Sequence, residues 1–382
     1  MTRRSDSDND GETSSPSPSW RPKKCKGEKH VSFPPDEEIV SGFAERKDTI
    51  NVDSLTLAEV IEAYKRSCDR HQVEPKPKIL EQLESVCLLR LDVCNVALLQ
   101  YPAQVLSRAL LSSRLTVLHL QSTCLSGRPL FTLVAALKSN RALRELYLSN
   151  NNLNSEQDSM QLGDLLRYNS SITTLDLSNN IIANSGLEEI CEGLRVQTDG
   201  LKVLILWNNQ ITNNGLVHLA KVLPVLKTLE TLNLGENNLQ NRGIHTLRES
   251  LMMNHSLLQL GLEHTHFTCE GAVALAEFLA ESRQIQRLDV RENEVRTGGL
   301  MALSLALRIN HSLTSLDLDH TPKQEQKAAA VNSDSLTLAE DFLMETQKSL
   351  LREISELCTG NAAHHRIAAE TELPWPDSSE TR

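Results

Sequence analysis

The chain has 382 residues, enough for one large domain with flanking tails. Its net charge of −11 argues against a nucleic-acid-binding protein, and no run of residues reaches the roughly 18 apolar positions of a membrane-spanning helix. Aromatic residues make up only 3%, whereas leucine is abundant, which suits a repeated core. The eight cysteines form no C-x-x-C pair, and the N-terminus lacks an apolar signal segment. We therefore expect a reduced, intracellular protein of the cytoplasm or nucleus, with no membrane segment.

Residues 1–50 predict an unstructured arm, because Ser, Pro, Asp and Lys are frequent at its start. Within this arm, the segment KHVSF (29–33) follows the pattern by which regulators of protein phosphatase 1 dock: a basic residue, then Val or Ile, then Phe or Trp, at alternate positions. Val31 and Phe33 are two residues apart, so an extended chain points both to one side. Such a segment can add a strand to a sheet edge and fill two pockets. Lys29, Val31 and Phe33 are the predicted docking residues; the alternative is a linker with incidental apolar residues.

Two further features of the arm bear on docking. Ile39 and Val40 lie six and seven residues after Phe33, where some phosphatase regulators place a second apolar pair; a hydrophobic lead-in to the next segment is the alternative. Ser32 lies inside the docking segment and is a candidate regulatory phosphorylation site. A phosphate there adds about two negative charges, so we expect it to weaken docking.

Residues 51–85 predict a helical lead-in that forms an incomplete N-terminal cap. The helix is expected over 56–71, because Thr56 and Glu59 have the spacing of a capping box. The chain then runs almost directly into the first repeat.

Residues 86–321 repeat the pattern L-x-x-L-x-L-x-x-N-x-L. The repeats start at positions 86, 115, 143, 172, 201, 229, 257, 285 and 313, so successive starts differ by 28 or 29 residues. After each strand motif, Leu and Ala recur at helical spacing. This regularity predicts an α/β leucine-rich-repeat solenoid, a right-handed horseshoe of the ribonuclease-inhibitor class, with parallel strands inside the curve and helices outside.

Five repeats carry asparagine at the ninth position of the pattern. An amide side chain is both donor and acceptor, so we expect it to satisfy turn backbone in its own and the next repeat. Threonine replaces it in three repeats and can satisfy only part of that backbone. The five asparagines are Asn151, Asn180, Asn209, Asn237 and Asn293.

Four apolar residues lie at strand positions that face the inside of the predicted curve. They are Tyr147, Val203, Ile205 and Trp207. An exposed apolar cluster there predicts a partner-binding patch. Local packing between neighbouring strands is the alternative.

After the repeats, residues 336–358 predict an amphipathic helix that caps the last repeat, and 359–382 predict an unstructured tail. The sequence contains no phosphate-binding loop, dinucleotide fingerprint, H-E-x-x-H or G-x-S-x-G motif. We therefore expect a protein that is not an enzyme and holds no cofactor. His264 and His266 have no obvious third ligand, so the sequence predicts no metal site.

Several stretches closely resemble the leucine-rich-repeat protein phosphatase 1 regulatory subunit 37 family. They include HVSFPPDEEIVSGFAE (30–45), LRELYL (143–148), LWNNQ (206–210), CEGAVALAEF (269–278) and RENEVRTGGLMALSLAL (291–307). The resemblance covers most of residues 29–320 and implies a non-catalytic subunit that binds the catalytic subunit of protein phosphatase 1 and inhibits or redirects it. Carried over by position, Lys29, Val31 and Phe33 would dock.

The chain departs from that family in two places. The family has more repeat-like chain before the repeat that starts at 86, and it carries a long acidic, proline-rich C-terminal tail. We therefore expect this chain, which ends at Arg382, to be a short form. Two other interpretations stay open: a leucine-rich-repeat scaffold for an unrelated protein partner, and a GTPase-activating repeat protein.

Overall fold

The computed structural model describes residues 89–321 apart from positions 112, 155 and 198, the helix 333–371, and isolated positions between 62 and 80. Of the isolated positions, 62, 65, 66, 68, 69, 77 and 80 are helical. Within the described residues, no helix combines the length and hydropathy needed to cross a bilayer. The docking segment and the rest of the arm lie outside the described residues.

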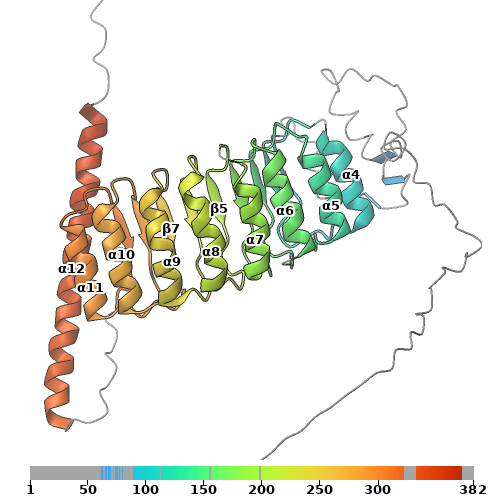
Figure 1. Ribbon diagram of the computed structural model, residues 1–382. Coiled ribbons are helices and arrows are strands. Elements are labelled where there is room, and N and C mark those ends of the chain that lie inside the picture. The colour runs from blue at the N-terminus through green and yellow to red at the C-terminus, as the bar shows by residue number, and fades with distance from the viewer. Residues whose placement is uncertain are drawn as a thin grey trace, which may run out of the picture. The chain divides into compact units, whose positions relative to one another are not determined.

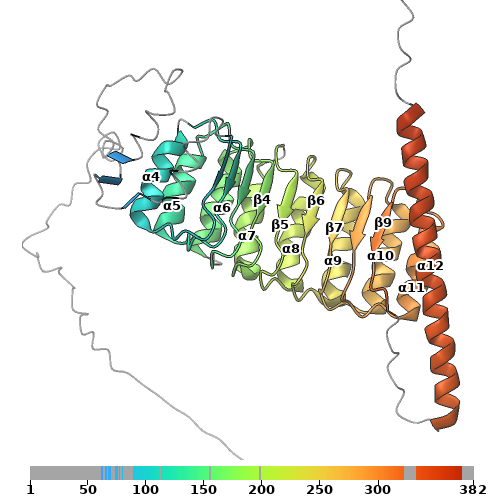
Figure 2. The same cartoon turned by 180° about the vertical axis from the view of Figure 1, so that it is seen from behind.

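Nine short strands pair side by side in chain order to form one parallel sheet (Figure 2). Each strand has three residues, because the motif places one leucine that faces the core between two residues that face away from it. The strands are β1 (Arg90–Asp92), β2 (Val117–His119), β3 (Glu145–Tyr147), β4 (Thr174–Asp176), β5 (Val203–Ile205), β6 (Thr231–Asn233), β7 (Gln259–Gly261), β8 (Arg287–Asp289) and β9 (Ser315–Asp317).

A helix follows each of the first eight strands, and these helices lie side by side on the opposite face of the solenoid (Figure 1). This arrangement confirms the predicted α/β leucine-rich-repeat fold. The helices are α4 (Gln100–Leu111), α5 (Arg128–Leu137), α6 (Gln157–Tyr168), α7 (Ala183–Leu194), α8 (Asn213–Val222) with a short 3-10 turn, η3 (Leu223–Val225), α9 (Gln240–Met253), α10 (Cys269–Glu281) and α11 (Thr297–Leu307).

The core is a continuous leucine layer between the sheet and the helices. The central leucines of neighbouring strands are in register, as Leu175, Leu204 and Leu232 show. These three side chains are fully buried, and each helix contributes its own buried leucines opposite them. Because no single repeat encloses its leucines, each repeat depends on its neighbours for burial.

The asparagines at the ninth position of the repeat pattern form a buried ladder along the turns that follow the strands. Asn151 Nδ2 donates to Leu148 O of its own repeat and to Leu120 O of the preceding one, and Asn151 Oδ1 accepts from Thr123 N and Leu125 N. We expected the amide to bond the backbone of its own repeat and of the next one. That expectation was wrong, because the second partner is the preceding repeat. The reason is that turn N–H groups point toward the following repeat, so the following repeat's asparagine meets them.

A second asparagine ladder, absent from the sequence predictions, follows the C-terminal ends of the helices. Asn169 is typical: its Nδ2 donates to Leu137 O and Asn140 O of the preceding repeat, and its Oδ1 accepts from Ser171 N and Ile172 N. The same 28–29-residue spacing that reveals the repeats would have revealed this ladder. Its members are Asn140, Asn169, Asn254 and Asn310, with Gln197 donating to Asn169 O.

The last repeat is closed by α12 (Ser333–Thr371), which lies against α11 (Figures 1 and 2). Asn361 Nδ2 donates to Asn310 O and Leu313 O. The bond to Asn310 O is one that a tenth repeat's ladder asparagine would supply, as Asn310 itself supplies one to Ser282 O. Gln347, also buried, donates to Thr297 Oγ1. The helix is longer than the expected 336–358 range, because residues 359–371, expected in the tail, are rich in alanine and contain no proline.

Candidate functional site

The exposed face of the sheet is the surface where the strands present side chains away from the core. Two residues of each strand flank the buried leucine and align with their counterparts in the neighbouring strands. Their chemistry changes along the sheet, from a mixture of charged, aromatic and other side chains in β1–β4, to uncharged in β5–β7, to mainly charged in β8–β9. The sheet face therefore has three zones.

In the first zone, an aromatic pair bridges β2 and β3. The rings of His119 and Tyr147 are stacked, with centroids 4.3 Å apart and planes 4° from parallel. The Tyr147 hydroxyl donates to Glu145 Oε2 at 2.8 Å. Burial raises the pKa of Tyr147 to about 12, and the hydrogen bond to Glu145 adds to the shift. Burial also lowers the pKa of His119, and the charge of Arg90 lowers it further.

In the middle zone, Val203 and Ile205 on β5 are half-buried, and Trp207 follows the strand. A Cβ added at Gly235 would lie 2.6 Å from Trp207 Cδ1, so the indole packs over a position that must lack a side chain. Tyr147 is not contiguous with these residues, because Asp176 lies between Tyr147 and Ile205 in the strand register. The four predicted patch residues thus divide into Tyr147 with its histidine partner and a β5 cluster of Val203, Ile205 and Trp207.

In the third zone, opposite charges pair between β8 and β9 and at the end of β8. Arg287 Nη2 lies 2.7 Å from Asp317 Oδ2, and Arg291 Nη2 lies 2.6 Å from Asp289 Oδ2. The bond to Asp289 holds the pKa of Arg291 above its usual value. A groove of about 600 Å³ separates β9 from α12 and is lined by both arginines together with Arg352. Exposed ion pairs of this kind contribute little to folding stability.

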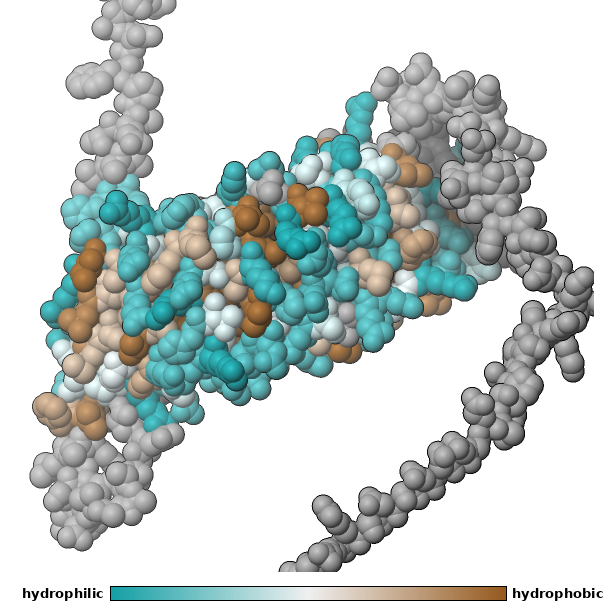
Figure 3. Space-filling model, in the orientation of Figure 1, coloured by the Kyte–Doolittle hydropathy of each residue, from teal (hydrophilic) through white to brown (hydrophobic). Residues whose placement is uncertain are grey.

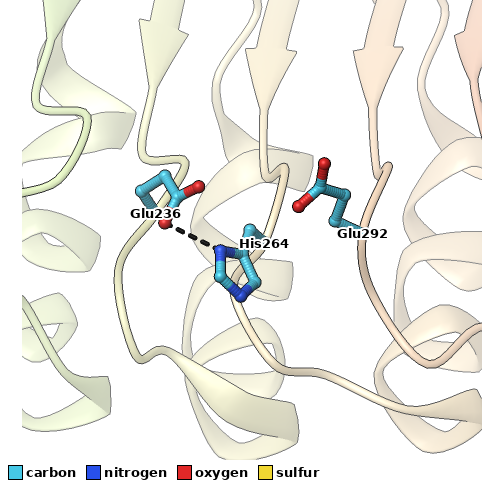
Figure 4. A group of neighbouring side chains, drawn as sticks. All are labelled: Glu236, His264 and Glu292. Atoms are coloured by element: carbon cyan, nitrogen blue, oxygen red, sulfur yellow. Dashed lines mark hydrogen bonds and ion pairs between the residues drawn. The ribbon is translucent and has the colours of Figure 1, made fainter.

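A cluster at the turn edge of the sheet was missed at the level of sequence. His264 Nδ1 lies 2.7 Å from Glu236 Oε2, and the Glu292 carboxylate faces the same histidine from the next turn (Figure 4). The three ligand atoms lie within 4.8 Å of one another. His266, the other histidine named in the sequence analysis, places its ring edge-on to that of His264, with centroids 4.7 Å apart. The identical 28-residue offset of the two glutamates from His264 is the signal that would have found them.

The helix face carries exposed apolar side chains, among them Phe131, Met160 and Leu305. Figure 3 shows several separate hydrophobic patches on this face, divided by polar surface. Scattered exposed apolar residues are normal in folded proteins, so this face gives less indication of a partner than the β5 cluster does.

The predicted docking residues, Lys29, Val31 and Phe33, lie outside the described residues, as do Ser32 and the pair Ile39 and Val40. The structure therefore does not test whether they bind a partner.

Comparison with known proteins supports the repeat assignment. Residues 142–165, 168–191 and 225–247 match families described as Leucine Rich Repeat. One solved structure, described as the Rad7 and Elc1 complex in yeast, is 18% identical with a TM-score of 0.38, covering 62% of this chain and 66% of that chain. A TM-score this low supports no inference about function.

Curated relatives have a higher sequence identity to this chain than that solved structure has. The chain is 40% identical over 293 residues to protein phosphatase 1 regulatory subunit 37 of Bos taurus, covering 53% of this chain and 42% of the relative. It is also 40% identical over 313 residues to the Homo sapiens protein of the same name, covering 57% and 45% respectively. These matches confirm the resemblance seen in the sequence. The chain spans less than half the length of these two relatives.

Proposed function

We propose that this chain is a non-catalytic regulatory subunit of protein phosphatase 1. The observation that carries the proposal is the 40% identity to relatives named as regulatory subunits of that phosphatase. The docking segment at 29–33, found from its residues alone, supports the same partner.

In this proposal, Val31 and Phe33 enter two pockets beside a sheet edge of the phosphatase, while Lys29 supplies a charge next to them. Burying one valine and one phenylalanine contributes about 1.5–3 kcal/mol each before ordering costs. Ile39 and Val40 supply a second apolar contact further along the arm.

The repeats supply the second contact, because docking by a short segment tethers the phosphatase without covering its active centre. The β5 cluster is the best-suited part of the sheet face: Val203, Ile205 and Trp207 are half-buried and apolar. The paired charges of the third zone, toward one end of the same face, favour one orientation of the partner. Docking by the arm then raises the effective concentration of this weaker contact. Through it the subunit inhibits the phosphatase or redirects it to other substrates.

The docking step is tested by a pull-down of the phosphatase catalytic subunit with the full chain. Val31→Ala/Phe33→Ala should lower capture by at least tenfold, since the two side chains carry a few kcal/mol of contact energy. Phe43→Ala/Ile50→Ala removes similar side chains from the same arm and should leave capture unchanged. Equal capture by the wild type and the Val31/Phe33 variant would refute docking through this segment.

The second contact is tested by comparing a 1–50 peptide with the full chain in a phosphatase assay. The peptide should bind yet leave activity toward protein substrates nearly unchanged, whereas the full chain alters it. Trp207→Ala should reduce the effect of the full chain without abolishing binding. A peptide that acts as strongly as the full chain would show that the repeats are not required.

A phosphoserine at 32 tests regulation of the same step. The added charge enters an apolar site, so a peptide phosphorylated at Ser32 should bind the phosphatase more weakly than the unmodified peptide. Equal affinities, measured by fluorescence anisotropy, would exclude this form of regulation.

A further inference from the structure

Three consecutive repeats place metal-ligating side chains at the same position of the turn that follows the strand. Glu236, His264 and Glu292 each lie four residues after the central leucine of β6, β7 and β8 respectively. Because the strands are parallel and in register, equivalent positions in neighbouring repeats lie side by side. The turn geometry therefore aligns a carboxylate, an imidazole and a carboxylate along the same edge (Figure 4).

The turn backbone does not require these residue types. All three residues have positive φ, 54°, 49° and 57°, a conformation that asparagine adopts more readily than glutamate. Three earlier repeats do have asparagine at the equivalent position, with φ of 57°, 55° and 52°. These are Asn150, Asn179 and Asn208. The local conformation alone does not account for a Glu–His–Glu row.

The charges of the cluster are not neutralised by nearby basic side chains. Within the described part of the chain, Glu236 pairs only with His264, and Glu292 makes no ion pair with lysine or arginine. The adjacent Arg291 is already engaged by Asp289 and Glu263. The edge is thus a region of negative potential that favours a cation.

We propose that Glu236, His264 and Glu292 form a binding site for a divalent transition-metal ion, with Zn²⁺ best matched to one imidazole nitrogen and two carboxylate oxygens. In its open sites, Zn²⁺ takes three protein ligands with water in the fourth position, whereas Ca²⁺ and Mg²⁺ need six or more oxygen ligands. In the site, His264 Nδ1, which now bonds to Glu236, coordinates the ion in place of that hydrogen bond. The three ligand atoms close from within 4.8 Å to the roughly 3.3 Å separation of tetrahedral Zn²⁺ ligands by side-chain rotation.

The test uses Zn²⁺ itself, titrated into the full chain and followed by calorimetry. The decisive variant is His264→Asn, because asparagine fits the left-handed backbone and occupies the equivalent turn elsewhere. It should bind one Zn²⁺ fewer than the wild type, while its thermal unfolding without metal occurs at the same or a higher temperature. The matched control, His255→Asn, removes an exposed histidine outside the cluster and should bind as the wild type does.

Two further measurements identify the ligands. Glu236→Gln and Glu292→Gln should each weaken Zn²⁺ binding by more than about tenfold. With Co²⁺ as the probe, the difference spectrum between wild type and His264→Asn should lack thiolate-to-metal absorption, which would come from a cysteine. The proposal fails if His264→Asn binds as much Zn²⁺ as the wild type, if neither glutamine variant weakens binding, or if the difference spectrum shows a thiolate ligand.

Discussion

At the scale of single residues, the ladder asparagines make more buried contacts than any other polar side chain of the turn. Asn237 Nδ2 donates to Leu206 O, Leu234 O and Gly235 O, and its Oδ1 accepts from Asn209 N and Ile211 N. Most of these backbone groups are shut off from water and have no other partner among the described residues once the amide is removed; the exception is Gly235 O, which also accepts from Asn208 N.

Asn237→Ala should therefore lower the free energy of unfolding by about 3 kcal/mol, since each buried group left unpaired costs roughly 1–3 kcal/mol. Asn237→Thr should lose less, because threonine at this position donates within its own repeat, as Thr265 Oγ1 does to Leu262 O. Urea unfolding measures both. The exposed Asn214→Ala is the control and should change little; an alanine variant as stable as the threonine variant would contradict the ladder's role.

The stacked His119 predicts a pH dependence of stability. The folded state lowers its pKa below 6.5, chiefly through burial, and its Nε2 is buried without a hydrogen-bond partner among the described residues. The unfolded chain therefore binds more protons just below pH 6.5, so stability falls as pH falls through this window. His119→Gln should reduce that loss relative to the wild type, as followed by urea unfolding from pH 7 to 5. His255→Gln should retain the wild-type slope, and an identical slope in His119→Gln would contradict the assignment.

At the scale of elements, α6 and α7 are held closer than neighbouring helices with side chains would allow. A Cβ on Gly193 would lie 2.1 Å from Gly163 O, and a Cβ on Gly163 would lie 2.3 Å from Glu189 O. Both obstacles are backbone atoms, so neither can rotate away. The glycines fix the packing distance of this pair.

Gly193→Ala should therefore lower the free energy of unfolding by about 1–3 kcal/mol, although alanine favours helix, because the two helices must separate. Gly360→Ala is the matched control: it lies in α12 with nothing within 4 Å of the added Cβ. It should stabilise the protein by up to about 1 kcal/mol through helix propensity alone. Thermal unfolding distinguishes the two, and a Gly193→Ala variant as stable as the wild type would show that the helices separate at little cost.

The elements also show how far the sequence predicts this structure. The strands and helices follow from the 28–29-residue period, because each Leu, Asn and helix start recurs at the same offset. The direction of the asparagine bonds did not follow, since it depends on which way the turn N–H groups point. The division of Tyr147 from the β5 cluster, and the meeting of His264 with Glu236 and Glu292, depend on the register between repeats. The pattern of one repeat does not contain that information; it emerges only when the 28-residue offset between repeats is applied to the turn positions.

At the scale of the whole molecule, a solenoid's end is its weak point, because the last repeat has a neighbour on one side only. Here α12 takes the place of that neighbour. It buries Ile354 against the core, donates from Asn361 to the last turn, and pairs Glu353 with Arg308 at 2.6 Å. The cap is thus built from a different secondary structure but still supplies the ladder bond to Asn310 O.

Stability in repeat arrays is roughly a sum of repeat and interface terms, so a weakened cap should affect nearby repeats most. Asn361→Ala leaves Asn310 O and Leu313 O unpaired and should speed amide hydrogen exchange in β9 and α11, while α4 and α5 exchange as in the wild type. The control is Glu356→Ala on the exposed side of α12, which should leave the exchange pattern unchanged. Uniform acceleration along the solenoid in Asn361→Ala would instead mean that all nine strands unfold as one cooperative unit. In that case the cap would set the stability of the whole array, the surface proposed to contact the phosphatase included.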